Sequence, residues 1–452
     1  MKQDDIFPIL QALQDPGPLD PNPANAEAAA EFKKLYIANL NAKQGDVAKN
    51  LNLEIRASTG ARHAYLFSGT IGSGKSTELL RLAQKLRPDH FAVVMNAKNY
   101  LNTQSPIEIV DLLLAMALCV WETTAYELKL DLEAGQSWSS WKAIFKADVE
   151  PEGLELNLGI AKLKTGLHQN PDVRDRLRKY HRARLDTLVQ EVNEFFDECA
   201  SKLKAKLNLT STAKMVLIVD SLEHFGGQAA AGDTDTVFTS LQHLFNDFAS
   251  LLKIKGWSTL FSVPPLLQKL APGIANTFGV AETYFLTSAH VFLDRTSDID
   301  LDTVDNKLIP LVKQRIGVEI VSKLIADAQI RDIIVKTGGD LRDLLRTLRS
   351  ALLVGLREEN FPINQSLLNK VYDTLRRPYL PLTNDAKARL QHVHLHYEPN
   401  LDKQEDWNQI IADLAQKRIL MYLNGTEWYG VHPLLVDYFK IKNASGSADT
   451  SN

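Results

Sequence analysis

Short apolar runs alternate with amphipathic segments along the first quarter of the chain. The runs at 64–69 (AYLFSG) and 91–97 (FAVVMNA) have the length of buried strands. The segments at 76–87 and 105–118 repeat apolar residues at helical spacing. Strand, glycine cluster, helix, strand and helix in this order predict an α/β fold with a parallel sheet.

The same patterns continue downstream. Further buried strands are expected at 214–220 (KMVLIVD), 257–265 (WSTLFSVPP) and 281–293 (AETYFLTSAHVFL). Helical periodicity runs from Glu27 to about Arg56, over 172–207 as one long amphipathic helix, and over 305–360. The alternating segment 153–164 is expected to form a hairpin or an extended flap.

The helix that follows the second strand has clear start signals. Ser105, Pro106 and Glu108 stand where a cap, a first-turn proline and a capping-box acid belong. The apolar run 112–121 (LLLAMALCVW) inside it is roughly half as long as the about 20 residues of a membrane span, which favours a buried helix.

The C-terminal region has a different order of elements. Helices are expected at 384–397 and 404–418, then two strands around Asn424-Gly425, a strong hairpin signal, and a short helix at 433–440. Helices followed by a β-hairpin suggest a winged helix-turn-helix.

Length and composition limit the alternatives. The 452 residues, 45% hydrophobic, are enough for two or three domains. The net charge of −4 gives no general polyanion-binding signature. Cys119 and Cys199 lack metal-type spacing, and the acidic, proline-containing start does not resemble a signal peptide. We therefore expect a cytoplasmic protein that makes no membrane contact.

The predicted domains are an irregular lead-in over 1–30 and an α/β core over 31–300 that contains the glycine cluster. The core carries a helical insertion at about 122–210. A helical lid over 301–362, a winged helix over 363–441 and a disordered tail over 442–452 follow.

The glycine cluster carries the strongest motif. GTIGSGKS matches G-x-x-x-x-G-K-[ST] at Gly69, Gly74, Lys75 and Ser76, between a predicted strand and a predicted helix. Its backbone N–H groups would converge on phosphate, with Lys75 neutralising the β- and γ-phosphates and Ser76 holding Mg²⁺. The expected nucleotide contacts of this loop are Gly69, Gly72, Ser73, Gly74, Lys75, Ser76 and Thr77. A chance match in a loop is the alternative.

The third strand supplies acids. Asp220 ends the apolar run and is expected to hold Mg²⁺, and Glu223 is positioned to orient or deprotonate water. A strand that merely ends in a solvated acid is the alternative. The guanine-reading N-K-x-D and the transporter signature LSGGQ are absent from the sequence, which leaves ATP as the expected nucleotide.

Basic and imidazole side chains give weaker signals. Arg342, in the first turn of a helix after two glycines, could reach a γ-phosphate, whereas Arg346 and Arg349 are better read as a solvated face. The basic run 174–184 is either a nucleic-acid contact or a solvated helix face, and His392 with His396 is either a metal pair or a helix face. No arginine finger can be assigned; Arg295 is only a guess.

The phosphate loop, the acids after the third strand, a polar fourth strand, GGDLRDLL and a C-terminal winged helix together resemble the AAA+/STAND ATPases, with the origin-recognition ATPases and bacterial STAND-type regulators closest. Several segments also resemble a group of bacterial P-loop ATPases of uncertain role: GSGKSTELLRLAQKL, YLNTQSPIEIVDLLLAMA, DSLEH, SVPP, GGDLRDLLRTLRSAL and NGTEWYGVHPLL. The resemblance covers roughly residues 30–440, apart from 122–210, and implies that the core over 31–300 is a P-loop ATPase core.

The resemblance implies roles for several residues. Asp220 would be the Walker B acid, Ser262 the polar sensor 1 and Arg342 sensor 2, while Ser221 matches the small residue after the acid. His224 stands where a further acid often occurs, which argues against fast hydrolysis.

One more implied role concerns the segment after the hairpin. His432 matches the histidine of the M-H-D segment, which touches the β-phosphate of ADP in the resting state of STAND switches. Pro433 replaces the aspartate, so the match is partial. A histidine packed under the wing is the alternative.

The leading functional hypothesis is an ATP/ADP regulatory switch, a slow ATPase with Mg²⁺, that controls a protein partner and opens or forms a homo-oligomer with ATP. Such switches often belong to multi-gene bacterial systems, defence systems among them. A DNA-binding loader ATPase and a non-hydrolysing assembly scaffold are the rival hypotheses.

Overall fold

The structure is a computed structural model that describes residues 3–14, 17–40, 45–59, 62–130, 164–165, 167–225, 234–271, 273–278, 283–295, 298–436 and 439. The chain divides into two compact units. We call Val47–Gly69 with Glu78–Phe285 the sheet unit, and Met1–Asp46 with Thr70–Thr77 and Leu286–Asn452 the loop unit. The domain limits predicted from the sequence stay predictions. The predicted flap at 153–163 and the predicted tail lie outside the described residues.

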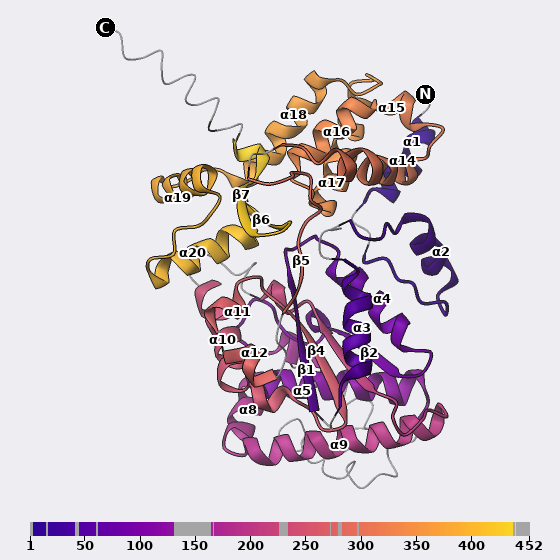
Figure 1. The fold of residues 1–452 in the computed structure, drawn as a ribbon, viewed down its shortest axis with the longest axis vertical. Helices are drawn as coiled ribbons and strands as arrows, with labels where there is room; N and C mark the ends of the chain where they lie inside the picture. The colour runs from indigo at the N-terminus through magenta and orange to yellow at the C-terminus, as the bar shows by residue number, and fades with distance from the viewer. Residues whose placement is uncertain are drawn as a thin grey trace. The chain divides into compact units, whose positions relative to one another are not determined.

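A five-stranded sheet with the order β2-β3-β4-β1-β5 forms the core of the sheet unit (Figure 1). The β2–β3, β3–β4 and β1–β4 pairs are all parallel, which confirms the predicted α/β fold. The strands are β1 (Arg62–Gly69), β2 (Phe91–Asn96), β3 (Met215–Asp220), β4 (Trp257–Val263) and β5 (Tyr284–Leu286). β5 is much shorter than the predicted strand at 281–293.

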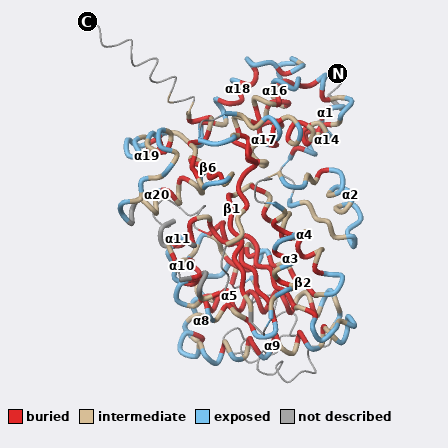
Figure 2. Tube along the Cα trace, viewed as in Figure 1, coloured by how far each residue is buried: buried red, intermediate tan, exposed pale blue. Residues whose placement is uncertain are grey.

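Helices cover this sheet, and Figure 2 shows the strands buried beneath them. α5 contacts β2 and β3, α9 contacts β4, and α12 contacts β1. The main helices are α3 (Val47–Ala57), α4 (Lys75–Leu86), α5 (Ile109–Glu122), α8 (Pro171–Arg182), α9 (Leu185–Lys206), α10 (Thr234–Asp247), α11 (Leu267–Leu270) and α12 (Gly273–Phe278). Short helical turns stand at Ala97–Asn99, Thr123–Glu127, Leu222–His224 and Ala249–Leu252.

Three helix predictions need correction. The periodicity between Glu27 and Arg56 belongs to two helices, α2 (Ala26–Leu35) and α3, rather than one. The long helix predicted at 172–207 is likewise two, α8 and α9, separated at Ala183 and Arg184. α5 begins three residues later than predicted, because Glu108 caps it together with Asp111 and Ser105 does not.

The apolar run in α5 is buried, as predicted. With the turn that follows, Ile109–Glu127 forms a 19-residue helical stretch that is long and apolar enough to cross a membrane by length and composition alone. Of its most apolar window, 78% is buried inside the structure, as in the core helix of a globular domain.

The loop unit is built on helices, with one small sheet. They are α1 (Gln3–Ala12), α2, α13 (Leu301–Thr303), α14 (Ile309–Ile316), α15 (Val321–Leu324), α16 (Asp327–Lys336), α17 (Leu341–Arg357), α18 (Gln365–Arg376), α19 (Asn384–His396) and α20 (Gln404–Ala415). Short helical turns stand at Val304–Leu308 and Arg377–Tyr379. β6 (Ile419–Leu423) and β7 (Glu427–Val431) form an antiparallel hairpin, as predicted, and residues 433–436 are helical.

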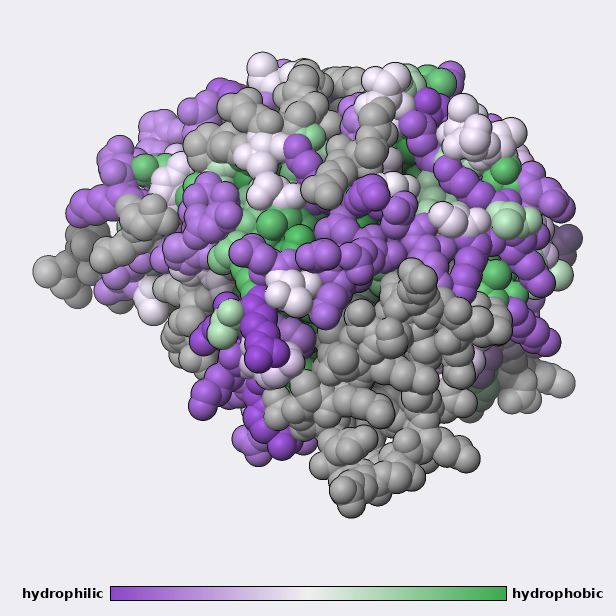
Figure 3. Space-filling view, turned by 90° about the horizontal axis from the view of Figure 1, so that it is seen from below, coloured by the Kyte–Doolittle hydropathy of each residue, from purple (hydrophilic) through white to green (hydrophobic). Residues whose placement is uncertain are grey.

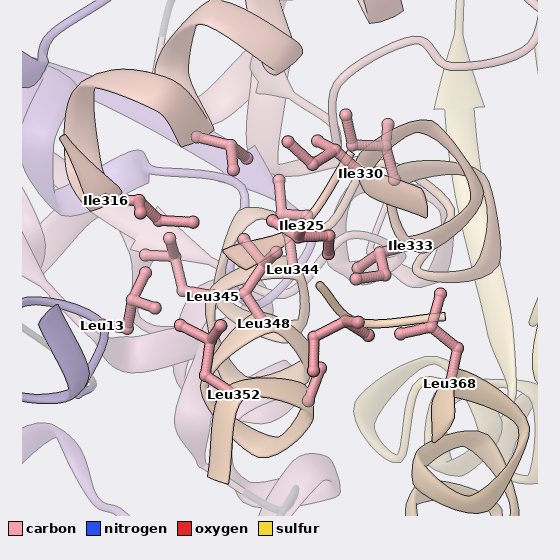
Figure 4. Packing of buried hydrophobic residues seen from close by; sticks show 14 of the residues in the cluster. Leu13, Ile316, Ile325, Ile330, Ile333, Leu344, Leu345, Leu348, Leu352 and Leu368 are labelled. Carbon is pink, nitrogen blue, oxygen red and sulfur yellow. The ribbon is translucent and has the colours of Figure 1, made fainter. Parts of the chain in front are cut away.

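One hydrophobic cluster holds the N-terminal segment to the helices of the loop unit. Leu13 packs with Leu345, Leu352 and Ile316 in this cluster (Figure 4). The lead-in predicted to be irregular therefore contains a helix, α1, whose apolar side chains Ile6 and Leu10 belong to the same core.

Exposed apolar side chains are scattered among the described residues. The large ones come from separate elements: Phe7, Leu53, Tyr126, Leu207, Leu293, Leu301, Val318 and Leu395. The face of the molecule in Figure 3 is mostly hydrophilic, with small hydrophobic areas, as is usual for an exposed protein surface.

Candidate functional site

The predicted phosphate loop has the local structure that its motif requires. β1 ends at Gly69, the loop follows, and α4 begins at Lys75. Gly74 has a φ of +95°, and a Cβ placed on it would meet no atom of the described residues within 4 Å. Lys75 Nζ is buried and donates a 2.8 Å hydrogen bond to the carbonyl oxygen of Thr70. Backbone N–H groups and a lysine at a helix N-terminus form an anion-binding arrangement.

Within the loop unit, the phosphate loop packs against the start of α17. A Cβ on Gly72 would stand 2.5 Å from Asp340 Oδ2, so no residue other than glycine fits there without movement. Asp340 is also the N-cap of α17, because its Oδ1 accepts a 2.9 Å hydrogen bond from the backbone N–H of Asp343. Sequence reasoning missed Asp340, although a cap signal before α17 is visible in the sequence.

Two further contacts tie the loop to distant parts of the same unit. Thr70 N donates to the Leu286 carbonyl at 3.2 Å, and its hydroxyl lies 3.3 Å from that of Ser288. The hydroxyl of Thr77 accepts a 3.1 Å hydrogen bond from Leu19 N in the N-terminal segment. The surroundings of the loop are therefore assembled from three separate stretches of chain.

The carboxyl edge of the sheet brings together three predicted residues within the sheet unit. The backbone N–H of Ser221 lies 2.7 Å from Asp220 Oδ1 and 2.9 Å from Ser262 Oγ. The Ser262 hydroxyl in turn donates to Glu223 Oε2, and all four side chains are buried. Ser221 adopts a left-handed conformation, with φ at +74°, which is uncommon for a residue other than glycine. This hydrogen-bond chain fixes the two carboxylates relative to one another.

His224 follows Glu223 at this edge. Its Nε2 lies 3.9 Å from Glu223 Oε1, too far for a hydrogen bond. A buried imidazole therefore stands beside the Glu223 carboxylate.

The first three arginines of α17 differ in their surroundings. Arg342 is half-buried in the first turn, two residues after the cap residue Asp340, whereas Arg346 is exposed on the next turn. Arg349 donates to the Leu10 carbonyl at 3.3 Å and so helps to hold α1. Of the three, only Arg342 combines partial burial with a position beside the cap.

His432 is buried just after β7. Its Nδ1 accepts a 3.2 Å hydrogen bond from the backbone N–H of Leu434, so the proton of a neutral ring is on Nε2. That Nε2 is buried without a hydrogen-bond partner among the described residues. Burial, with a smaller contribution from the positive charge of Lys417, lowers the pKa of His432 to about 3. At neutral pH the ring is a neutral donor whose N–H is left unsatisfied.

The basic run at 174–184 is largely used inside the sheet unit. Arg178 lies 2.5 Å from Asp111 Oδ2, and Arg182 pairs with Glu108, so α8 is tied to the start of α5. Burial raises the pKa of Asp111, and its hydrogen bonds with Arg178 oppose that rise. These pairings favour a structural role over nucleic-acid contact.

The weaker candidates gain no support from the described part of the chain. The rings of His392 and His396 lie 4.4 Å apart, and no group of three His, Cys, Asp or Glu residues that could hold a metal occurs among the described residues. Arg295 pairs with Glu398 at 2.9 Å in the loop unit.

The chemistry of the loop fits a polyphosphate with a hard cation. The loop offers glycine backbone, an ammonium and the hydroxyl of Ser76. Within the sheet unit, β1 and β3 run parallel to β4 and end at the same edge, where Asp220 closes β3.

Comparisons with known proteins give distant structural similarity only. No protein-family model and no curated protein matches the chain. It is similar to the Walker-type ATPase of Pyrococcus abyssi, with 10% identity and a TM-score of 0.47, over 95% of this chain and 99% of that one. The ORC2 protein of Aeropyrum pernix (ADPNP-ADP complexes) follows with 10% identity and a TM-score of 0.37, over 96% and 98%. The ORC1 protein of the same organism in complex with DNA has 12% identity and a TM-score of 0.35, over 90% and 95%. Because these scores lie below 0.5, the functional argument rests on the residues of this chain.

Proposed function

We propose that the chain is an ATP-binding and ATP-hydrolysing regulatory switch that controls a partner protein. The observation that carries this proposal is the packing of Gly72 in the phosphate loop against Asp340, the cap of α17. A ligand that changes the loop must change the surroundings of that cap. Occupancy of the loop and the state of the helices around α17 are then coupled.

Each side chain of the proposed site has a role in the reaction. Lys75 would bind the β- and γ-phosphates, while Ser76 and Asp220 would hold Mg²⁺, which supplies positive charge for phosphoryl transfer. Glu223, positioned by Ser262, would orient the attacking water and accept its proton. Arg342 would reach the γ-phosphate from the first turn of α17.

The unsatisfied N–H of His432 supports the switch over a simple ATPase. A buried donor without a partner is costly, and an oxygen of the β-phosphate of ADP would satisfy it. His432 also lies within the electrostatic influence of Asp340, which contacts the loop. We propose that the region 363–441 is a winged helix that closes on ADP through this histidine, in a cytoplasmic protein.

The test is the ratio of ADP to ATP affinity in His432→Ala. Loss of a hydrogen bond to a charged group costs about 1.5–3 kcal/mol, so ADP should weaken about tenfold more than ATP. Titration calorimetry measures both affinities, and His396→Ala, an exposed histidine of the same unit, is the matched control.

Two other outcomes would redirect the proposal. A lower melting temperature with an unchanged ADP/ATP ratio would make His432 a core residue and remove the argument for a switch. Turnover that rises with duplex DNA in a salt-dependent manner would favour the loader ATPase, and ATP binding without turnover would favour the scaffold.

A further inference from the structure

Two carboxylates and one ammonium meet at the start of α17. Lys417 Nζ lies 2.8 Å from Asp340 Oδ2 and donates a 2.9 Å hydrogen bond to Asp343 Oδ2. The Asp340 side chain is 1% exposed and that of Lys417 is 13% exposed. All three residues belong to the loop unit. Two acids thus share the ammonium of Lys417, and the exposed Arg346 also acts on Asp343.

Lys417 stands at a position where lysine is unusual. It follows the last turn of α20 with a φ of +57°, and its N–H donates to the Leu414 carbonyl at 3.1 Å. A left-handed residue just after a helix is most often glycine, because a side chain is disfavoured in that conformation. Unlike glycine, lysine at this position supplies an ammonium beside Asp340 and Asp343.

The Asp340 carboxylate connects this cluster to the phosphate loop. Its Oδ1 caps α17, and its Oδ2 lies 2.8 Å from Lys417 Nζ. Both oxygens face the loop, because a Cβ on Gly72 would stand 2.5 Å from Oδ2 and 2.7 Å from Oδ1. One carboxylate group therefore lies between the ammonium and the loop backbone.

Polyphosphate in the loop would have opposite effects on the two charged groups of this arrangement. Its negative charge repels the Asp340 carboxylate and attracts the Lys417 ammonium, and burial weakens solvent screening of both effects. Lysine carries its charge on a flexible four-carbon stem with three donors, so its ammonium can move between partners.

We propose that Lys417 is a nucleotide-binding residue supplied by the C-terminal region, held ready by Asp340 and transferred to the phosphates of a nucleoside di- or triphosphate. The inference rests on the proposed nucleotide binding and adds a second phosphate-binding lysine to it. Because Lys417 follows α20, its transfer would also report loop occupancy to the C-terminal helices.

The decisive comparison is between Asp340→Asn and the double variant Asp340→Asn/Lys417→Met. Asparagine keeps the cap of α17 and removes the carboxylate that Lys417 would otherwise have to neutralise. We expect Asp340→Asn to bind ADP and ATP at least as tightly as wild type, and the double variant to bind both about tenfold or more weakly. Calorimetry with ADP, ATP and inorganic pyrophosphate gives the affinities.

Controls separate this inference from the function that it deepens. Lys370→Met removes the same charge from an exposed ion pair with Glu358 and should leave the affinities unchanged. Without nucleotide, Lys417→Met should melt at a lower temperature than the double variant, because Asp340 then stays buried and unpaired. Equal affinities of the single and double variants would overturn the role of Lys417 alone. Failure of the wild type to bind any nucleotide would overturn both proposals.

Discussion

The carboxyl edge of the sheet and the start of α17 both bury two acids, but they treat them differently. At the sheet edge, Asp220 and Glu223 are joined through Ser221 N–H and the Ser262 hydroxyl into one hydrogen-bond chain. At the start of α17, Asp340 and Asp343 share one ammonium, and the Nε2 of His432 nearby has no partner among the described residues.

This difference in how the acids are held indicates different roles for the two regions. Groups held in a hydrogen-bond network keep one geometry, which suits catalysis because no reorganisation is needed during the reaction. Groups whose charges are incompletely balanced respond strongly when a ligand charge arrives, which suits a switch. We therefore expect substitutions at the sheet edge to change turnover, and substitutions around α17 to change affinity and conformation.

Lys75→Ala should give the largest effect, because it removes the ammonium proposed to bind the phosphates of both nucleotides. Loss of the phosphate counter-charge should weaken ATP and ADP about a hundredfold or more. The fold should survive, since the lysine belongs to the loop rather than to a hydrophobic cluster. Calorimetry and a thermal melt test this, with Lys85→Ala near the other end of α4 as control. Wild-type affinity in Lys75→Ala would disprove the phosphate-loop assignment.

The second-largest effect should be a loss of stability in acid, caused by His432 near the start of α17. The pKa of His432 falls to about 3 on folding, chiefly by burial, so the folded chain keeps the ring neutral while the unfolded chain protonates it near 6.5. The stability that depends on the neutral ring is complete above pH 6.5 and is lost as the pH falls toward 3. Between pH 7 and pH 5 the loss is about 2 kcal/mol.

Urea unfolding at the two pH values measures this loss in wild type and in His432→Leu. The variant should be less acid-sensitive by about that amount. Asp343 works in the opposite direction, because burial and Asp340 raise its pKa, but it is present in both proteins and cancels in the difference. Equal acid sensitivity of the two proteins would show that His432 is protonated in the folded chain.

The sheet and the phosphate loop could be predicted because their signals are local. Apolar runs marked β1 to β4 within a few residues, and glycines between a strand and a helix marked the loop. Gly45, with a φ of +74°, could also have marked the interruption between α2 and α3. No glycine or proline marks the break between α8 and α9, so that break could not be read from the sequence.

Tertiary contacts decided the rest. α5 begins at Glu108 instead of Ser105 because Asp111 accepts from the Glu108 N–H, and the same carboxylate binds Arg178 of α8. Asp340 and Lys417 escaped sequence reasoning for the same reason. A capping aspartate and a lysine after a helix acquire their meaning only from Gly72, which is far away in the chain.

The smallest effect should follow from changes at the sheet edge, and it should appear in turnover alone. Glu223→Gln preserves the shape of the side chain and an oxygen that can accept from Ser262, but removes the base. ATP turnover should fall at least about tenfold, while ATP affinity and the ADP/ATP ratio stay as in wild type. A shifted ratio would mean that this edge also takes part in the switch.

Ser262→Ala keeps the Glu223 carboxylate and removes the donor that positions it. One hydrogen bond is worth about 0.5–1.5 kcal/mol, so turnover should fall about two- to tenfold, less than in Glu223→Gln. Single-turnover hydrolysis with saturating ATP measures both variants without interference from binding. If the Glu223 carboxylate is the base, Glu223→Gln must lower turnover more than Ser262→Ala, which removes only the bond that positions it. If Ser262→Ala lowers turnover and Glu223→Gln does not, the base lies elsewhere and Ser262 acts through another group.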